Sequence, residues 1–152
     1  YNMMDIQAAL GIHQLARVET NWQRRQSIWQ NYQSAFADLP VICPNEPDSN
    51  TRHGYHLYNL LIDETKIGIN RDQFLDAMTN HKIGVGVHYL SIPEHPFYQQ
   101  NFNWRPEDYP NAMKVGRQTV SLPLSAKLND IEIKNVVETI KNIFKSIISR
   151  ID

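Results

Sequence analysis

Residues 1–16 read YNMMDIQAALGIHQLA, and from Ile6 to Ala16 this segment carries no formal charge. Apolar residues at helical spacing continue to about Phe36, which predicts one helix over residues 5–36 with Asp5 as its N-cap. At about 1.5 Å per residue such a helix is about 48 Å long, whereas a domain of this chain length is about 40 Å across. We therefore expect the apolar end to project beyond its own domain and to lie beneath other protein. We therefore expect the chain to be a C-terminal piece of a longer protein, or one half of a larger assembly.

The composition excludes several classes of protein. The 152 residues carry a formal net charge of −1, with no local cluster of Lys and Arg, so nucleic-acid binding is disfavoured. No apolar run approaches the ~20 residues of a membrane span, and no secretory signal opens the chain. The single Cys43 cannot form a disulfide within the chain, which fits a reducing compartment. We expect a cytoplasmic protein.

The remaining pattern predicts an α+β fold: a long N-terminal helix followed by a small three- to four-stranded, mainly antiparallel sheet covered by helices. Two helices are expected to begin at Asn70 and Asn129, because each is followed three residues later by a side chain suited to a capping box. With no obvious linker we expect a single domain, with the long helix within residues 1–40 and the small sheet with its helices within residues 41–152. The expected strands are residues 41–43, 55–62, 83–89 and 120–124.

The segment Ile83–Tyr89 carries the strongest candidate site. Alternation along a strand places Gly84, Gly86 and His88 on one face. Two glycines beside a histidine leave room for a ligand or another chain to approach, with His88 as a hydrogen-bonding group. Close packing of the sheet face against a helix explains the same pattern, and both interpretations stay open.

Other candidates are weaker. His53 and His56 fall on opposite faces of an extended segment, and no Cys or carboxylate completes a metal-ligand set. His95 lies in a loop that either hosts a binding residue or is a turn. The sequence contains neither a serine-nucleophile motif nor a glycine-rich phosphate-binding motif. The residues alone show a possible half-site and no complete catalytic set.

Four blocks resemble, in order, the sugar aminotransferases of the DegT/DnrJ/EryC1/StrS family. They extend over essentially the whole chain and are YNMMDIQAALG at residues 1–11, YHLY at 55–58, IGVGVHY at 83–89 and SLPL at 121–124.

The resemblance implies the small domain of a fold-type-I aminotransferase, an enzyme that is normally a homodimer with active sites at the subunit interface. Such an enzyme uses pyridoxal phosphate to transfer an amino group, usually from glutamate, to a nucleotide-linked keto sugar, here in surface-polysaccharide or amino-sugar biosynthesis. An N-terminal domain is expected to precede this chain and to supply the Schiff-base lysine. Residues 1–40 then form an interdomain and dimer-interface helix, and the chain alone should be inactive.

The resemblance also implies roles for four residues. Asn2, with Tyr1 beside it, matches an Asn that reaches the cofactor phosphate of the neighbouring subunit. His88 and Tyr89 match a block that approaches the substrate pocket. The Met3-Met4 pair departs from the commoner pattern, in which a hydroxyl residue precedes Asp5.

Two other hypotheses remain. The first is a non-catalytic interaction or regulatory module derived from this family, which would use the apolar helix face to bind protein. The second is a free-standing ligand-binding domain.

Overall fold

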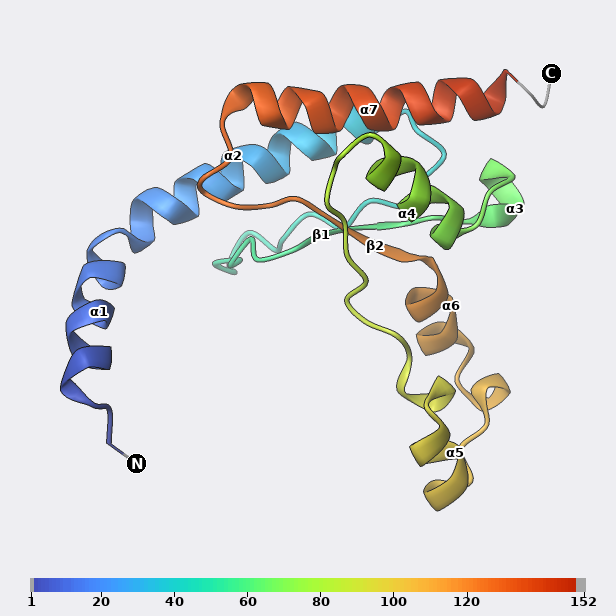
Figure 1. Cartoon of the computed structure of the whole chain (residues 1–152), viewed down its shortest axis with the longest axis horizontal. Helices are drawn as coiled ribbons and strands as arrows, with labels where there is room; N and C mark the ends of the chain where they lie inside the picture. Colours follow the sequence, from blue (N-terminus) through green and yellow to red (C-terminus); the bar gives the residue numbers. More distant parts are fainter. Residues whose placement is uncertain (1, 150–152) are drawn as a thin grey trace.

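The computed structural model describes residues 2–149. Two long helices, several shorter ones and a small sheet make up the chain (Figure 1). In chain order the elements are α1 (Asp5–Ala16), α2 (Val18–Phe36), β1 (Tyr58–Leu61), α3 (Glu64–Ile67), α4 (Arg71–Asn80), η1 (Ile92–Glu94), α5 (Pro96–Phe102), η2 (Pro106–Asp108), α6 (Pro110–Gln118), β2 (Thr119–Leu122) and α7 (Asp130–Ile148).

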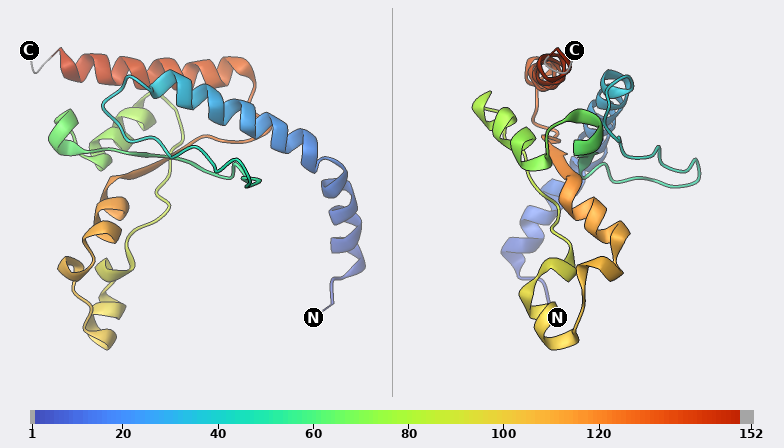
Figure 2. Two further views of the ribbon diagram at one scale, coloured as in Figure 1. Left: turned by 180° about the vertical axis from the view of Figure 1, so that it is seen from behind. Right: turned by 90° about the vertical axis from the view of Figure 1, so that its right-hand side faces the viewer.

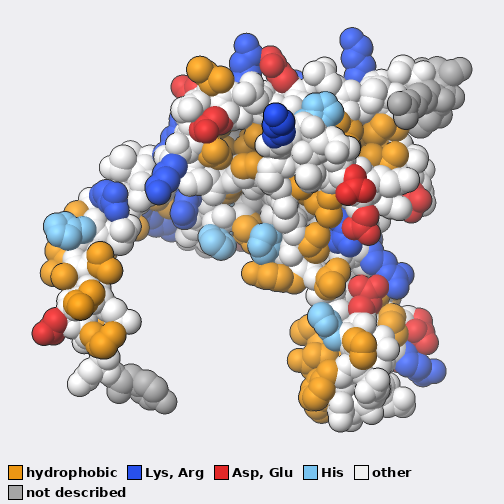
Figure 3. Space-filling view, viewed as in Figure 1, with side chains coloured by type: hydrophobic (Ala, Val, Ile, Leu, Met, Phe, Trp, Pro, Cys, Tyr) orange, Lys and Arg blue, Asp and Glu red, His pale blue; other side chains and the backbone are white. Residues whose placement is uncertain are grey.

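The chain forms an arch. Helices α2 and α7 lie side by side along its top, with the sheet beneath them (Figure 1). Two arms leave the arch on the same side: α1 forms one, and α5 with α6 forms the other (Figure 2). The space-filling view shows a broad hollow between the arms, with apolar side chains on both of them (Figure 3). No helix within the described residues is both long enough and apolar enough to cross a bilayer.

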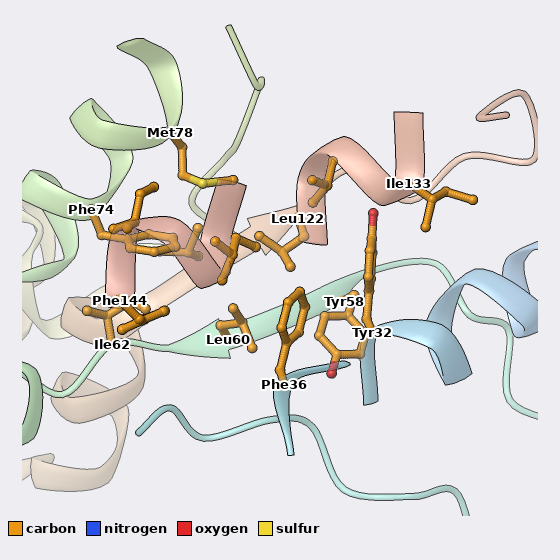
Figure 4. Close-up of a cluster of buried hydrophobic side chains, with 14 of the residues drawn as sticks. Tyr32, Phe36, Tyr58, Leu60, Ile62, Phe74, Met78, Leu122, Ile133 and Phe144 are labelled. Atoms are coloured by element: carbon orange, nitrogen blue, oxygen red, sulfur yellow. The ribbon is translucent and has the colours of Figure 1, made fainter. Parts of the chain in front are cut away.

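The hydrophobic core lies between one face of the sheet and three helices. Tyr58, Leu60 and Ile62 are almost wholly buried and point toward α2, α4 and α7 (Figure 4). Phe74 of α4 and Phe144 of α7 meet there, with ring centroids 5.7 Å apart. Because alternate residues of β1 point to opposite faces, the opposite face carries Asn59 and Leu61, which are only partly buried.

The sheet is smaller than the sequence pattern predicts. It contains two antiparallel strands, β1 and β2, with Tyr58 opposite Leu122 and Leu61 opposite Thr119. The expected strands at residues 41–43 and 83–89 each make a single bridge, at Ile42 and Gly86. Pro40 and Pro44 flank the first segment and remove backbone donors, while glycines weaken strand structure in the second. The antiparallel arrangement is confirmed, but a sheet of three or four full strands is wrong.

The predicted single helix over residues 5–36 is also wrong, because the helix breaks at Arg17. The N–H of Arg17 donates to Gln14 O at 3.1 Å, three residues back, so the last turn of α1 tightens and α2 leaves in a new direction. The N-cap is Met4, not Asp5, and the Met4 N–H donates to Gln7 Oε1 at 3.1 Å. Both predicted capping boxes, at Asn70 and Asn129, are confirmed.

No residue of α1 is buried. Ile6 is 76% exposed and Leu15 is 73% exposed. The rest of the described chain therefore leaves the apolar surface of this helix uncovered, as the charge-free segment predicts.

Candidate functional site

Three segments that are distant in sequence meet at Ser121, on the sheet face opposite the core. Ser121 of β2 lies opposite Asn59 of β1 in the antiparallel register. On its other side Ser121 bridges Gly86: its N–H donates to Gly86 O at 2.8 Å, and the Gly86 N–H donates to Ser121 O at 3.1 Å. This pairing brings the loop that carries His88 against the edge of the sheet.

Their side chains form a short polar chain. The His88 Nδ1 lies 2.8 Å from Ser121 Oγ, which lies 2.6 Å from Asn59 Oδ1. Ser121 is only 5% exposed, so its hydroxyl needs partners inside the protein. The two contacts supply them, and they fix the position of the His88 ring.

Gly86 makes room for that ring. A Cβ built on Gly86 would lie 3.0 Å from His88 Cε1, closer than side chains normally approach. One of the two interpretations of the sequence pattern is that glycines beside His88 open the backbone to a ligand. At Gly86 the histidine ring itself occupies the space, so the histidine is the group that a ligand would meet.

A shallow pocket of about 270 Å³ lies over this cluster, lined by Leu57, Val85, His88 and Ser121 among others. Tyr89 follows His88 through a cis peptide bond and is 74% exposed. Its ring packs edge-on against the His88 ring, with centroids 4.8 Å apart. His88 and Tyr89 are therefore adjacent at an open surface, as a binding site requires.

The proposed cofactor residues lie elsewhere. Tyr1 is outside the described residues. Asn2 is exposed and precedes α1, whose N-terminal end is at the tip of one arm (Figure 1). The structure does not bring Asn2 close to the sheet edge against which the His88 loop lies.

Of the other histidines, His56 is exposed and also lines the pocket beside His88. His53 and His95 have structural contacts or exposed positions. The His53 ring packs edge-on against Tyr55 at 4.7 Å, and the His53 carbonyl accepts a 2.7 Å hydrogen bond from Trp22 Nε1. His95 is the N-cap residue of α5 without a side-chain hydrogen bond. Among residues 2–149, no three His, Cys, Asp or Glu side chains are arranged to hold a metal ion.

Sequence reasoning missed Asn59 and Ser121 as site residues. Each is a polar residue inside a mostly apolar strand segment, and a polar side chain in such a place generally needs a polar partner. That signal could have marked both positions, although it could not have joined them to His88.

Larger hollows are also present, and one of about 690 Å³ shares Gly84 and Pro123 with the pocket beside His88. Another of about 750 Å³ runs between α2 and α7, where Arg24 is paired with Asp130 at 2.7 Å. Arg24 and Asp130 are engaged with each other there, so we place the candidate site at the smaller pocket, where His88 faces open space.

Comparisons with known proteins match nearly the whole chain to one family. The model of the DegT/DnrJ/EryC1/StrS aminotransferase family matches residues 1–141. The spore coat polysaccharide biosynthesis protein SpsC of Bacillus subtilis (strain 168) is 39% identical over 145 residues, which are 95% of this chain and 37% of SpsC.

Two solved structures are also similar. Spr1654 of Streptococcus pneumoniae, assigned as a sugar aminotransferase, superimposes in its PLP-form with a TM-score of 0.85 at 29% identity, over 96% of this chain and 37% of Spr1654. Helicobacter pylori PseC, an aminotransferase involved in the biosynthesis of pseudoaminic acid, gives 0.84 at 28% identity, over 96% of this chain and 38% of PseC. The chain thus spans a little over a third of the length of these relatives.

Proposed function

The chain belongs to the DegT/DnrJ/EryC1/StrS aminotransferase family, and on this premise we propose that it is the C-terminal part of a pyridoxal-phosphate-dependent sugar aminotransferase. The intact enzyme transfers an amino group from glutamate to a nucleotide-linked keto sugar, in the cytoplasm, for polysaccharide or amino-sugar biosynthesis. The similarity to SpsC supports the polysaccharide assignment.

The observation that carries this proposal is the His88 cluster on the uncovered sheet face. His88 is held by Ser121 at 2.8 Å and is adjacent to the exposed Tyr89. In this role His88 and Tyr89 line the sugar-binding side of the active site, where they bind and orient the substrate.

The residues of this chain fit the cofactor only in part. Every lysine among the described residues is exposed, and none lies in the pocket beside His88. A lysine activated by desolvation is therefore not provided here. Asn2 fits better, since its amide can donate to a phosphate oxygen close to a helix N-terminus that favours anions.

Bound pyridoxal phosphate would supply the electron sink that amino-group transfer requires. In the proposed assembly Asn2, with Tyr1 beside it, holds the cofactor phosphate across a homodimer interface. An N-terminal domain supplies the covalent attachment, and this chain closes the substrate side.

In this proposal the N-terminal domain and the second subunit occupy the hollow between the arms. Residues 1–40 would form the interdomain and dimer interface, and residues 41–152 the small domain. Large apolar side chains are exposed on both arms, including Leu10 on α1 and Phe97 and Phe102 on α5. Exposed apolar surface on this scale is typical of a protein interface.

The direct test uses the intact protein with pyridoxal phosphate, glutamate and nucleotide-linked keto sugars. We expect visible absorbance from the bound cofactor and formation of an amino sugar with stoichiometric release of 2-oxoglutarate. A protein that binds no cofactor and transfers no amino group would contradict the proposal. That result would favour a non-catalytic interaction module, as would a coding sequence without a further domain upstream of Tyr1.

A further inference from the structure

We propose that Ser121 and Asn59 hold His88 in the tautomer protonated on Nδ1, so that Nε2 accepts a hydrogen bond from a hydroxyl group of the sugar substrate. The identity of the ligand rests on the proposed function. The tautomer rests on the geometry of the three side chains alone.

The first step concerns the proton of Ser121. A serine hydroxyl has one proton to donate, and an amide oxygen can only accept. Ser121 Oγ lies 2.6 Å from Asn59 Oδ1. This separation is typical of O–H···O hydrogen bonds and is shorter than the usual ~2.7–3.2 Å range of N–H···O bonds, so the oxygen of Asn59 faces the hydroxyl. Ser121 therefore donates its proton to Asn59.

The second step concerns His88. Because the Ser121 proton is already engaged, Ser121 Oγ can only accept from the Nδ1 that lies 2.8 Å away. Nδ1 must then carry a proton. In the neutral imidazole the other ring nitrogen, Nε2, has a free lone pair.

The third step concerns the direction of the ring. The ring lies over Gly86 and is packed edge-on by Tyr89, so two neighbours limit its rotation. No hydrogen bond from Nε2 to any residue within 2–149 accompanies the one at Nδ1. The ring lines the open pocket of about 270 Å³, which leaves Nε2 available to a ligand.

The chemistry of the ligand follows. An unprotonated Nε2 accepts hydrogen bonds from hydroxyl or ammonium groups. The diphosphate of a nucleotide sugar has only acceptor oxygens at neutral pH, so it could not form a hydrogen bond with the unprotonated Nε2. Sugar hydroxyls can donate. A hydroxyl donor is therefore favoured over the phosphates, and on the proposed function we assign it to the sugar ring, with Ser121 and Asn59 acting as positioning residues.

The tautomer can be measured without any activity. The intact protein is labelled with ¹⁵N-histidine, and His88 is assigned by its absence in the His88→Gln variant. Ring ¹⁵N shifts distinguish a protonated from an unprotonated nitrogen, and we expect Nδ1 to be protonated and Nε2 to be bare. Protonation at Nε2, alone or together with Nδ1, would overturn the inference.

Variants test whether Ser121 sets the tautomer of His88. Ser121→Ala should abolish the Nδ1-protonated signature, and Ser121→Thr, which keeps the hydroxyl, should restore it. Ser34→Ala is the matched control, because this exposed serine on α2 bonds only to Gln30 O of its own helix. A Ser121→Ala spectrum identical to wild type would also overturn the inference.

Steady-state kinetics test whether His88 contacts the keto sugar and not glutamate. Ser121→Ala should raise KM for the keto sugar about three- to tenfold, the usual weight of one hydrogen bond, and leave KM for glutamate unchanged. Equal effects on both substrates would contradict a sugar contact. If the protein transfers no amino group at all, the proposed function fails, while the spectra still decide whether the tautomer is as inferred.

Discussion

At the scale of single residues, the site depends on side chains that the sequence keeps far apart. Ser121 Oγ lies between His88 and Asn59, whose positions differ by 29 in the sequence. Each of the three is an ordinary residue in its strand or loop. Their combination holds the histidine in one orientation at the open pocket.

Replacing His88 tests its place in the reaction. In the intact enzyme, His88→Ala should slow the half-reaction with the keto sugar about tenfold, because one oriented hydrogen bond is lost. The half-reaction with glutamate should change little. Single-turnover kinetics of each half-reaction measure this, with His81→Ala as the control, since His81 caps α4 away from the pocket and bonds Ala77 O. Equal losses in both half-reactions would argue against a sugar-specific role.

Gly86 offers a gentler test of the same site. A methyl group at this position would lie 3.0 Å from His88 Cε1, so Gly86→Ala should displace the ring and raise KM for the sugar several-fold while the protein still folds. Gly54→Ala is the control, because a methyl group on Gly54 would meet no atom within 4 Å. Indistinguishable kinetics for the two variants would show that the ring is not confined by Gly86.

Two buried tyrosines predict how stability depends on pH. Burial raises the pKa of Tyr32 and Tyr58 above the ordinary value. Above about pH 10, where an exposed tyrosine ionises, the unfolded chain loses these protons but the folded chain keeps them. The free energy of unfolding should therefore fall as pH rises past about 10, and it should be unaffected by these groups below that value.

Urea unfolding at about pH 9 and about pH 11 measures this fall. Tyr32→Phe should reduce the pH dependence, although it also removes the 2.9 Å hydrogen bond that Tyr32 donates to Pro123 O. Tyr109→Phe, at a more exposed tyrosine, is the control. If the free energy of unfolding depends on pH equally in the wild type, Tyr32→Phe and Tyr109→Phe, Tyr32 is not the source of that dependence.

At the scale of elements, local sequence signals placed the starts of α4 and α7 well and strand extents poorly. Capping is a contact between neighbours in sequence: Asn129 Oδ1 accepts from the Glu132 N–H at 2.9 Å, and Glu132 accepts from the Asn129 N–H at 2.8 Å. The length of a strand depends on pairing with segments that are distant in the sequence. The segments around Ile42 and Gly86 have extended patterns, yet each pairs through one residue.

The cap of α7 can be tested directly. Asn129→Ala should lower the free energy of unfolding by about 1 kcal/mol, since it leaves N-terminal donors of the helix without their partner. Asn135→Ala, within the same helix and exposed, should be neutral or slightly stabilising because alanine favours helix. Chemical denaturation measures both. A smaller loss for Asn129→Ala than for Asn135→Ala would contradict the assigned cap.

At the scale of the whole molecule, the distribution of apolar surface matters most. The core between the sheet and α2, α4 and α7 is buried, but α1 has no buried residue. Leu10 is 61% exposed. The proposal that an N-terminal domain covers this arm predicts that the exposure is removed in the intact enzyme.

Leu10→Gln tests that covering. If Leu10 is buried against another domain or subunit, the substitution should lower the stability of the intact protein by about 1.5–3 kcal/mol and weaken cofactor retention. His13→Gln, a polar-to-polar change on the same helix, should have little effect. Thermal unfolding and hydrogen exchange over residues 5–16 measure both variants. No difference between them would mean that this arm remains uncovered.

The order of residues along the chain was sufficient for the α+β class, the two capping boxes, the apolar character of α1 and the family, because these depend on neighbouring residues or on ordered blocks. The break at Arg17, the two-stranded extent of the sheet and the contact of His88 with Ser121 and Asn59 emerged only from the folded molecule. The physical reason is range. Capping and amphipathic periodicity act within a few residues, whereas strand pairing and side-chain clusters join segments whose register is set by packing of the whole core.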